Sequence, residues 1–293
     1  MGKLYIIGNG FDLHFGLKTA VSDFKTYLAR EEVYDKSLNA LDVFGVYGVN
    51  WGDYEQSLIN MELDAIEDEN ELGPDYLSDR ETDRDGGILN MQMVVDSLSD
   101  SVRSALHKMV LDANHALEQK EPIASPIFKA GDAILSFNYT STIETLYTMP
   151  DSVPICHLHG YVEDGTELIF GYKDNKTNHR HNWADLGEDG DYYLQQQRSI
   201  VYRFYQCCEK PLQLKKLKEF LWMCKGIDHV VVLGHSMQDV DSDYMELIEH
   251  TFSPDSWEIS CYNGYPNMDS LQSYSFFQKI HIQDFDKLLF GKI

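Results

Sequence analysis

The sequence predicts an α/β fold built on a doubly wound, mainly parallel sheet of the Rossmann-like kind. Short apolar runs recur without polar alternation, which is typical of strands buried on both faces of a parallel sheet. Most of these runs precede a stretch with helical periodicity, as in strand–helix–strand units. Glycine and small polar residues follow the apolar runs, at the sheet edge where such folds bind ligands.

Seven short segments are expected to be strands. In chain order they are residues 3–8 (KLYIIG), 133–138 (AILSFN), 154–160 (PICHLHG), 167–171 (ELIFG), 229–234 (HVVVLG), 257–262 (WEISCY) and 279–285 (KIHIQDF). Helices are expected after most of them, for example at residues 140–149, 239–252 and 267–279.

Two long stretches interrupt this alternation. Residues 21–128 show helical patterns and no convincing strand, and residues 191–225 form a second helical stretch. Residues 1–293 are therefore predicted to form a single α/β domain with a helical insertion at residues 31–128. Within it, residues 67–87 carry many charges and few apolar side chains, which is typical of a solvated acidic loop.

The composition disfavours several classes of function. Acidic residues outnumber basic ones by 48 to 24, a formal charge of −24, so general nucleic-acid binding is disfavoured. No apolar run approaches the ~18 residues of a membrane span, and no signal peptide is visible. The five cysteines contain no Cys-x-x-Cys pair, which excludes a four-cysteine zinc site. We expect a cytoplasmic protein with no membrane partner and no bound metal.

Candidate binding and catalytic residues lie at the ends of the expected strands. They are Gly8, Asn9, Gly10, Phe11 and Asp12 after the first, Asn138 after the second, His157 and His159 in the third, Gly171 and Asp174 after the fourth, and Gly234, His235, Ser236 and Asp239 after the fifth. Because the carboxyl ends of parallel strands meet at one edge of the sheet, these residues are expected to form one site.

The first of these turns has two interpretations. A strand–Gly-x-Gly–helix turn lets backbone N–H groups approach a diphosphate, but the dehydrogenase fingerprint needs a third glycine where Leu13 stands. A dinucleotide site and a tight structural turn both stay open. If the site is real, Gly10→Val should abolish nucleotide binding and leave the fold largely intact. Asp12 is expected either to bind a ribose hydroxyl or to cap the following helix.

Four blocks of the sequence resemble the signature blocks of the bacteriophage abortive-infection AbiH family, in the same order. They are IIGNGFDLHFGLKTAVSDFK, ILSFNYTSTIETLY, CHLHG and VVLGHSMQDVDSDYM. The blocks are also similar, more distantly, to the sirtuin-like NAD-binding fold. The resemblance implies an anti-phage abortive-infection protein that binds NAD, as substrate or ligand, and hydrolyses its nicotinamide–ribose bond. The cysteine pairs of the deacetylase zinc ribbon are missing, which argues against deacetylation.

The sirtuin-like resemblance also implies roles for particular residues. The turn at Gly8 and Gly10 would open the NAD site, with Asn9, Phe11 and Asp12 beside it. The block VVLGHSMQDVDSDYM would contact the adenosine half of NAD through Gly234, His235, Ser236 and Asp239. Asn138 would hold the nicotinamide ribose or a water molecule, and His159 would act on that ribose as a general base. His157 and His159 are two residues apart on an expected strand, so they are expected to share a face, and which of them is catalytic stays open.

Three other functions are compatible with the sequence. The first is a non-catalytic module that binds a nucleotide or senses phage. A serine hydrolase would use Ser236 with His281 as base, although Gln238 replaces the last glycine of the nucleophile elbow. A metal-dependent nuclease would use histidine pairs and an aspartate, namely His157 with His159, His179 with His181, and Asp174 or Asp239. Two further partners stay open, a phage-derived trigger and a second copy of the chain in a homo-oligomer.

Overall fold

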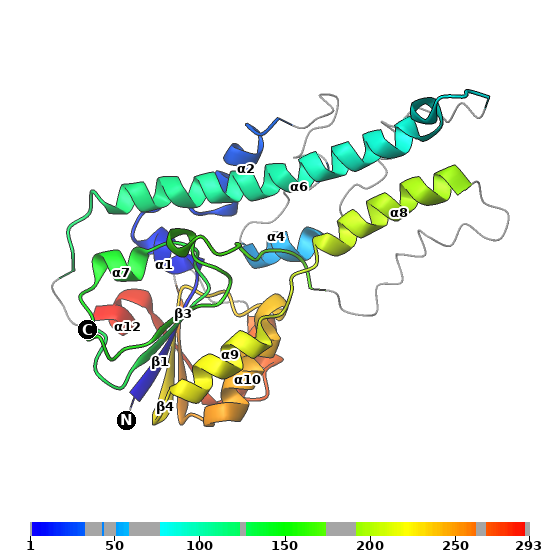
Figure 1. Cartoon of the computed structure of the whole chain (residues 1–293). Coiled ribbons are helices and arrows are strands. Elements are labelled where there is room, and N and C mark those ends of the chain that lie inside the picture. The colour runs from blue at the N-terminus through cyan, green and yellow to red at the C-terminus, as the bar shows by residue number, and fades with distance from the viewer. Residues whose placement is uncertain are drawn as a thin grey trace. The chain divides into compact units, whose positions relative to one another are not determined.

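The computed structural model describes residues 2–32, 43, 51–58, 77–123, 127–173, 192–261 and 268–290 (Figure 1). The chain divides into two compact units. Unit 1 comprises Met1–Ala20, Met109–Ile169 and Pro211–Ile293, and unit 2 comprises Val21–Lys108 and Phe170–Lys210. Unit 2 thus contains most of the expected insertion together with a second segment that sequence analysis did not assign to it. The number of domains stays a prediction.

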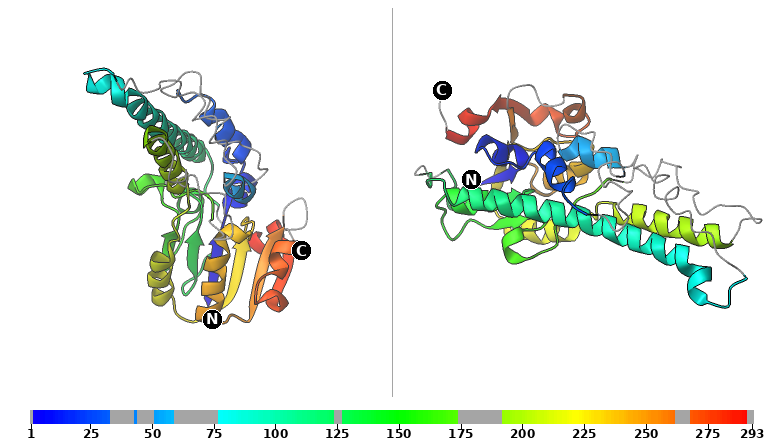
Figure 2. Two further views of the ribbon diagram at one scale, coloured as in Figure 1. Left: turned by 90° about the vertical axis from the view of Figure 1, so that its right-hand side faces the viewer. Right: turned by 90° about the horizontal axis from the view of Figure 1, so that it is seen from above.

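Unit 1 contains a six-stranded sheet in which every neighbouring pair of strands is parallel. Its strands are β1 (Gly2–Ile7), β2 (Ala133–Ser136), β3 (Ile155–His157), β4 (Ile227–Leu233), β5 (Ser256–Cys261) and β6 (Ile280–Asp284). The strand order is β3-β2-β1-β4-β5-β6, and Figure 2 shows β1 (blue) between β2 (green) and β4 (yellow). This order confirms the predicted doubly wound α/β class.

The strands are apolar at successive positions because helices cover both faces of the sheet. Leu4 and Ile6 of β1 point into one core, and Tyr5 and Ile7 point into the other. The first core packs against α9 (Leu214–Met223), α10 (Ser242–Phe252) and α11 (Met268–Gln272). The second packs against α1 (Asn9–His14), α7 (Thr142–Leu146), α12 (Phe285–Phe290) and the end of α6 (Glu81–Leu117).

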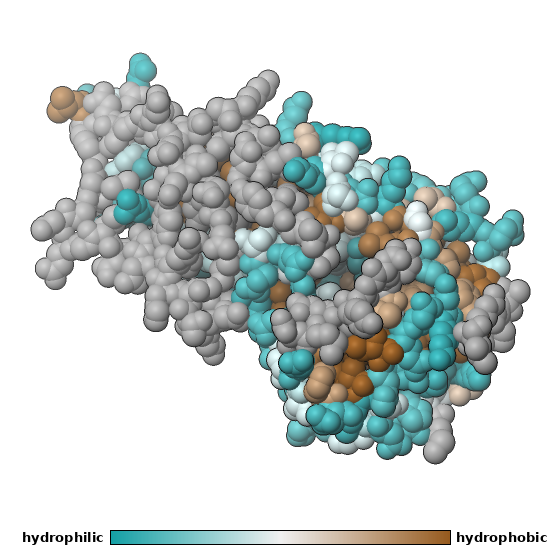
Figure 3. All heavy atoms as spheres, turned by 180° about the vertical axis from the view of Figure 1, so that it is seen from behind, coloured by the Kyte–Doolittle hydropathy of each residue, from teal (hydrophilic) through white to brown (hydrophobic). Residues whose placement is uncertain are grey.

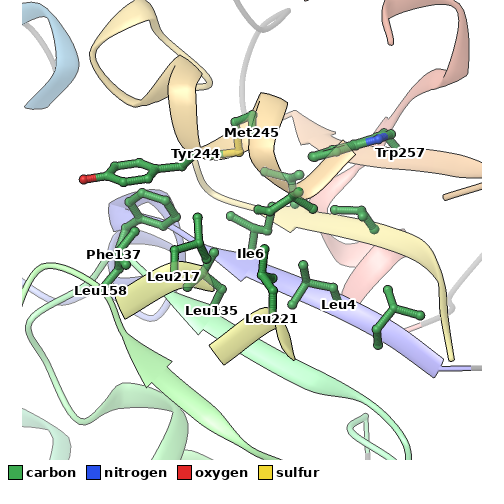
Figure 4. Packing of buried hydrophobic residues seen from close by; sticks show 14 of the residues in the cluster. Leu4, Ile6, Leu135, Phe137, Leu158, Leu217, Leu221, Tyr244, Met245 and Trp257 are labelled. Carbon is green, nitrogen blue, oxygen red and sulfur yellow. The ribbon is translucent and has the colours of Figure 1, made fainter. Parts of the chain in front are cut away.

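Figure 4 shows the first core at close range. Leu217 and Leu221 of α9 and Tyr244 and Met245 of α10 pack with Leu4, Ile6 and Leu135 of the sheet. Phe137, which follows β2, lies beside the Tyr244 ring, with the ring centroids 5.8 Å apart. The apolar core therefore reaches the carboxyl edge of the sheet, where the candidate residues lie.

The strand expected at residues 167–171 is wrong. The described chain forms no strand there, and β3 is the edge of the sheet. Residues 167–170 are exposed or half-buried, and Ile169 donates one backbone hydrogen bond, to His159 O at 2.8 Å. An apolar run of this length resembles a buried strand in sequence, but here no neighbouring strand completes a ladder with it.

Unit 2 contains helices rather than strands in the part that the structure describes. They are α2 (Val21–Leu28), α4 (Trp51–Ser57), α8 (Tyr192–Cys207) and the residues of α6 up to Lys108. Residues 81–87, expected in an acidic loop, belong to α6, and residues 67–76 of that loop lie outside the described residues.

Aromatic side chains and one buried ion pair hold the described part of unit 2 together. Phe24 lies near Trp51 and Tyr54, with ring centroids 5.3 and 5.7 Å away. Lys210 Nζ lies 3.1 Å from Glu55 Oε2, and both side chains are buried. Glu55 and Lys210 come from the two chain segments of unit 2, so this ion pair joins them. Separating the two residues would leave an unpaired buried charge, which is strongly destabilising.

Hydrophilic side chains cover much of the described surface on one face of the molecule (Figure 3). The coloured part of the face in Figure 3 is mainly hydrophilic, with hydrophobic side chains confined to small areas. Among the helices of the described residues, none is both long and apolar enough to cross a membrane.

Candidate functional site

The ends of β1, β2, β3 and β4 lie at the same edge of the sheet, because all four strands run parallel. After β1 the chain adds β2 and β3 on one side, and β4 then pairs on the other side of β1. The order therefore reverses between β1 and β4, which is where folds of this class bind ligands. The predicted residues after these strands all belong to this edge.

The turns after β1 and β4 are in direct contact. Gly8 N–H donates to Leu233 O at 3.0 Å, and Gly10 N–H donates to Gly234 O at 2.8 Å. A Cβ atom on Gly10 would lie 2.8 Å from both Cα and O of Gly234, closer than real Cβ contacts. The expectation that Gly10→Val leaves the fold intact is therefore wrong, because the space beside Gly10 is filled by protein backbone. Nucleotide binding by residues 8–12 stays a prediction.

Asp12 is a buried carboxylate with two hydroxyl donors. Its oxygens accept hydrogen bonds from Thr140 Oγ1 at 2.7 Å and from Thr142 Oγ1 at 2.6 Å. Burial raises the pKa of Asp12 to about 6, and the hydrogen bonds from the two threonines offset only part of that rise. Asp12 lies inside α1, whose N-cap is Gly8, so it does not cap this helix. Its carboxylate instead joins α1 to the chain after β2, and a ribose contact stays a prediction.

Replacing Asp12 with asparagine should change how stability depends on pH. The folded carboxyl has a pKa of about 6 against an ordinary value of 3.8, so the folded protein holds this proton more tightly than the unfolded chain. The stability that Asp12 contributes is present below about pH 4 and is lost as the pH rises through about 6. Between pH 4.5 and 7.5 the variant should therefore gain about 2 kcal/mol on the parent, because part of the Asp12 titration is already complete at pH 4.5.

Urea unfolding of both proteins at the two pH values measures this gain. Asp151→Asn, at an exposed position of unit 1, is the matched control and should show no such gain. Parallel pH dependences of the parent and Asp12→Asn would contradict the assignment of a raised pKa to Asp12.

Asn138 is buried and ties the ends of β1 and β2 together. Its Nδ2 donates to Gly8 O at 3.1 Å, and its backbone N–H donates to Ser136 Oγ at 3.2 Å. The amide group predicted to hold a ribose is thus anchored to the opening turn. Its catalytic role stays a prediction.

His157 and His159 reach different partners. His157 Nε2 lies 2.7 Å from Glu144 Oε1, its Nδ1 lies 3.1 Å from Asn138 O, and its ring stacks on Tyr161. These contacts engage both ring nitrogens of His157 within the structure. Because β3 ends at His157, the strand alternation expected to place both histidines on one face does not continue to His159.

His159 is buried in a cluster with a second histidine and an aspartate. The Phe137 ring lies edge-to-face with His159 at 4.9 Å and with His235 at 4.4 Å. His159 Nε2 lies 3.8 Å from Asp241 Oδ1, and His235 Nε2 lies 3.3 Å from Asp241 Oδ2. One carboxylate therefore faces both imidazoles, and the Phe137 ring that contacts both histidines directly precedes Asn138 in the chain.

Comparison with known protein families identifies the chain. The family described as "Bacteriophage abortive infection AbiH" matches residues 4–262, which is more than half of the 293 residues. The chain belongs to this family. Membership supports a role in anti-phage abortive infection and confirms the resemblance of the four sequence blocks to the AbiH family. No curated protein matches the chain.

The candidate site of this AbiH chain includes residues that sequence analysis missed. Asp241 stands two positions after the predicted Asp239, and the 3-10 helix η3 (Asp239–Asp241) leaves Asp239 exposed while Asp241 faces the histidines. Phe137 directly precedes Asn138, so an aromatic residue at this strand end was visible in the sequence. Thr140 precedes Thr142 by two positions, and both hydroxyls donate to Asp12. Its contact with Asp12 depends on the pairing of β1 with β2.

The geometry of the AbiH chain gives no support to a pair of Ser236 and His281. Ser236 is exposed, and the left-handed backbone of this turn is at Met237 (φ 54°), whereas a nucleophile elbow places the strain at the serine. His281 pairs with Glu258, which pairs with Val231 in the body of β4. His281 is thus two strands from β4, roughly 10 Å, and out of hydrogen-bond reach of the turn.

A metal-dependent nuclease gains no support from the described residues. No group of three His, Cys, Asp or Glu side chains in this part of the AbiH chain could hold a metal ion. His179, His181 and Asp174 lie outside the described residues.

Proposed function

We propose that this AbiH protein binds NAD, or a related nucleotide, at the carboxyl edge of its sheet and hydrolyses the bond between nicotinamide and ribose. The observation that carries the proposal is the buried His159–Asp241 pair, with its 3.8 Å separation, at the point where the strand order reverses. A histidine held beside a carboxylate is suited to accept a proton at neutral pH.

The reaction needs few groups. The bond between C1′ of the ribose and the nicotinamide nitrogen breaks, and the bonding electrons leave with nicotinamide. Water adds to C1′, and its proton passes to His159. Asn138 holds the ribose hydroxyls or the water through its amide. Asp241 stabilises the imidazolium that forms, because it lies 3.8 Å from His159 Nε2.

The residues at the edge fit NAD in part. The side chains proposed for the reaction come from neighbouring strand ends. The N–H groups of Gly8 and Gly10 donate to the carbonyl groups of Leu233 and Gly234 at the end of β4, so other groups would have to meet the diphosphate. The alternative is a non-catalytic module that binds a nucleotide or senses phage, and the engaged N–H groups favour the second of these two roles.

An assay of nicotinamide release separates the two functions. Purified protein is incubated with NAD, with and without phage lysate, and nicotinamide and ADP-ribose are measured by chromatography. We expect equal amounts of both products. NADH is the matched control, because its neutral dihydronicotinamide is a poor leaving group and should stay attached.

Thermal stabilisation by NAD without products would favour the sensor. No products and no stabilisation, with or without lysate, would overturn the proposal. The comparison with lysate also tests the proposed phage-derived trigger, and light scattering on the same samples tests the proposed homo-oligomer. We propose a cytoplasmic location for this activity.

A further inference from the structure

The position of the proton on His235 follows from its neighbours. The Met237 N–H donates to His235 Nδ1 at 3.0 Å. A ring nitrogen that accepts a hydrogen bond carries no proton, so the neutral imidazole must carry its proton on Nε2. His235 Nε2 lies 3.3 Å from Asp241 Oδ2, so the protonated nitrogen of His235 faces this oxygen.

The backbone at Met237 holds this arrangement in place. Met237 has a left-handed backbone (φ 54°), which is unusual for a residue other than glycine. Its side chain is fully buried in the core, and its carbonyl accepts a hydrogen bond from Tyr274 Oη at 3.2 Å. The core contact and the tyrosine stabilise a backbone conformation that aims the Met237 N–H at His235.

The second oxygen of Asp241 faces His159. Asp241 Oδ1 lies 3.8 Å from His159 Nε2, and the His159 ring is held by Phe137 and Tyr244 at centroid distances of 4.9 and 5.8 Å. Exposure of the three side chains is low, at 4% for His159, 13% for Asp241 and 5% for His235. In such a poorly hydrated place a carboxylate strongly favours an N–H group over a ring lone pair.

We propose that Asp241 is a positioning residue that sets the tautomer of His159. Asp241 accepts the Nε2 proton of His235 on one oxygen, and with the other it holds the proton of His159 on Nε2. The basic nitrogen of His159 is then Nδ1, which faces away from the carboxylate. The role of Nδ1 as the base rests on the proposed function, whereas the assignment of the two tautomers does not depend on it.

The test uses the full chain without any ligand. Long-range ¹H–¹⁵N correlation spectra at neutral pH distinguish the two neutral tautomers of each imidazole. Signals among the 11 histidines are assigned with His159→Gln and His235→Gln. We expect the Nε2–H form for both residues in the parent protein.

Asp241→Asn sharpens the test. Because Met237 keeps the proton of His235 on Nε2, the new amide must turn its oxygen toward His235 and its NH₂ group toward His159. An NH₂ group facing Nε2 requires a lone pair there, so His159 should change to the Nδ1–H form while His235 stays unchanged. Asp286→Asn, which alters the partner of His14 at 3.4 Å, is the matched control and should move neither signal.

Kinetics of variants shown to be folded by their melting temperatures add a second readout. If NAD is hydrolysed, Asp241→Asn should lower kcat by ~10²–10⁴-fold with KM little changed, because the base nitrogen is then blocked. Asp241→Glu should restore part of kcat, since it keeps the carboxylate.

The outcomes separate this inference from the proposed function. Predicted tautomers in a protein that releases no nicotinamide would support the role of Asp241 and contradict the hydrolase. An Nδ1–H form of His159 in the parent, or an unchanged His159 tautomer in folded Asp241→Asn, would overturn the role of Asp241 whether or not NAD is cleaved.

Discussion

His159→Ala should lower the rate of nicotinamide release by ~10²–10⁴-fold, the usual cost of losing a general base. NAD affinity should change little, because the proposed partner of His159 is the attacking water rather than the nucleotide. Asn138→Ala should lower both rate and affinity, since its amide is proposed to hold the substrate. The measurements are nicotinamide release, NAD binding and melting temperature on the same preparations.

The matched control for this prediction is His281→Ala, which removes an exposed histidine near the amino end of β6, at the opposite edge of the sheet from the candidate site. It should leave rate and affinity unchanged. If His159→Ala and Asn138→Ala are well folded and still protect cells against phage, the catalytic assignment fails. If both instead melt early and lose activity only through unfolding, they are packing residues.

Gly234→Ala should destabilise the fold far more than Gly16→Ala. Both glycines have left-handed backbones, with φ of 70° and 74°. A Cβ on Gly16 would meet nothing within 4 Å, whereas a Cβ on Gly234 would overlap the backbone of Phe11 and Gly10. The left-handed conformation costs a non-glycine residue about 1–2 kcal/mol at either site. Overpacking adds about 1–3 kcal/mol at Gly234 alone.

Urea unfolding of the two variants measures this difference in the free energy of unfolding. The Gly16 variant serves as the control, because it carries the conformational cost without the contact. Equal losses would show that the contact between the turns at Gly10 and Gly234 contributes little to stability. The turn at Gly8 and Gly10 would then be free to serve as a ligand-binding turn.

Much of the sheet could be predicted because its strands are covered on both faces. Val230 and Val232 face one core while Val231 and Leu233 face the other, so the whole run is apolar and visible in one sequence. The segment at residues 167–171 has a similar composition and is no strand, because pairing depends on a neighbour that composition does not reveal.

The candidate site could be predicted only for residues that stand at the end of a strand recognisable in the sequence. Asn138 and His159 stand directly after apolar runs, so their place at the carboxyl edge follows from the parallel order. The contact of Gly10 with Gly234 joins residues far apart in the chain and depends on the pairing of β1 with β4. Asp241 could not be predicted from the sequence, because its partner His159 is distant in the chain.

The central place of β1 has a consequence for synthesis of the protein on the ribosome. β1 is made before both of its neighbours, which begin only at Ala133 and Ile227. At the usual ~5–20 residues per second, the apolar β1 waits roughly 10–45 s before its second neighbour emerges. During that interval its unpaired edge can be held by chaperones or join other chains. A product that stops before residue 227 would keep that edge open permanently, so premature termination should yield aggregated protein rather than a smaller folded unit.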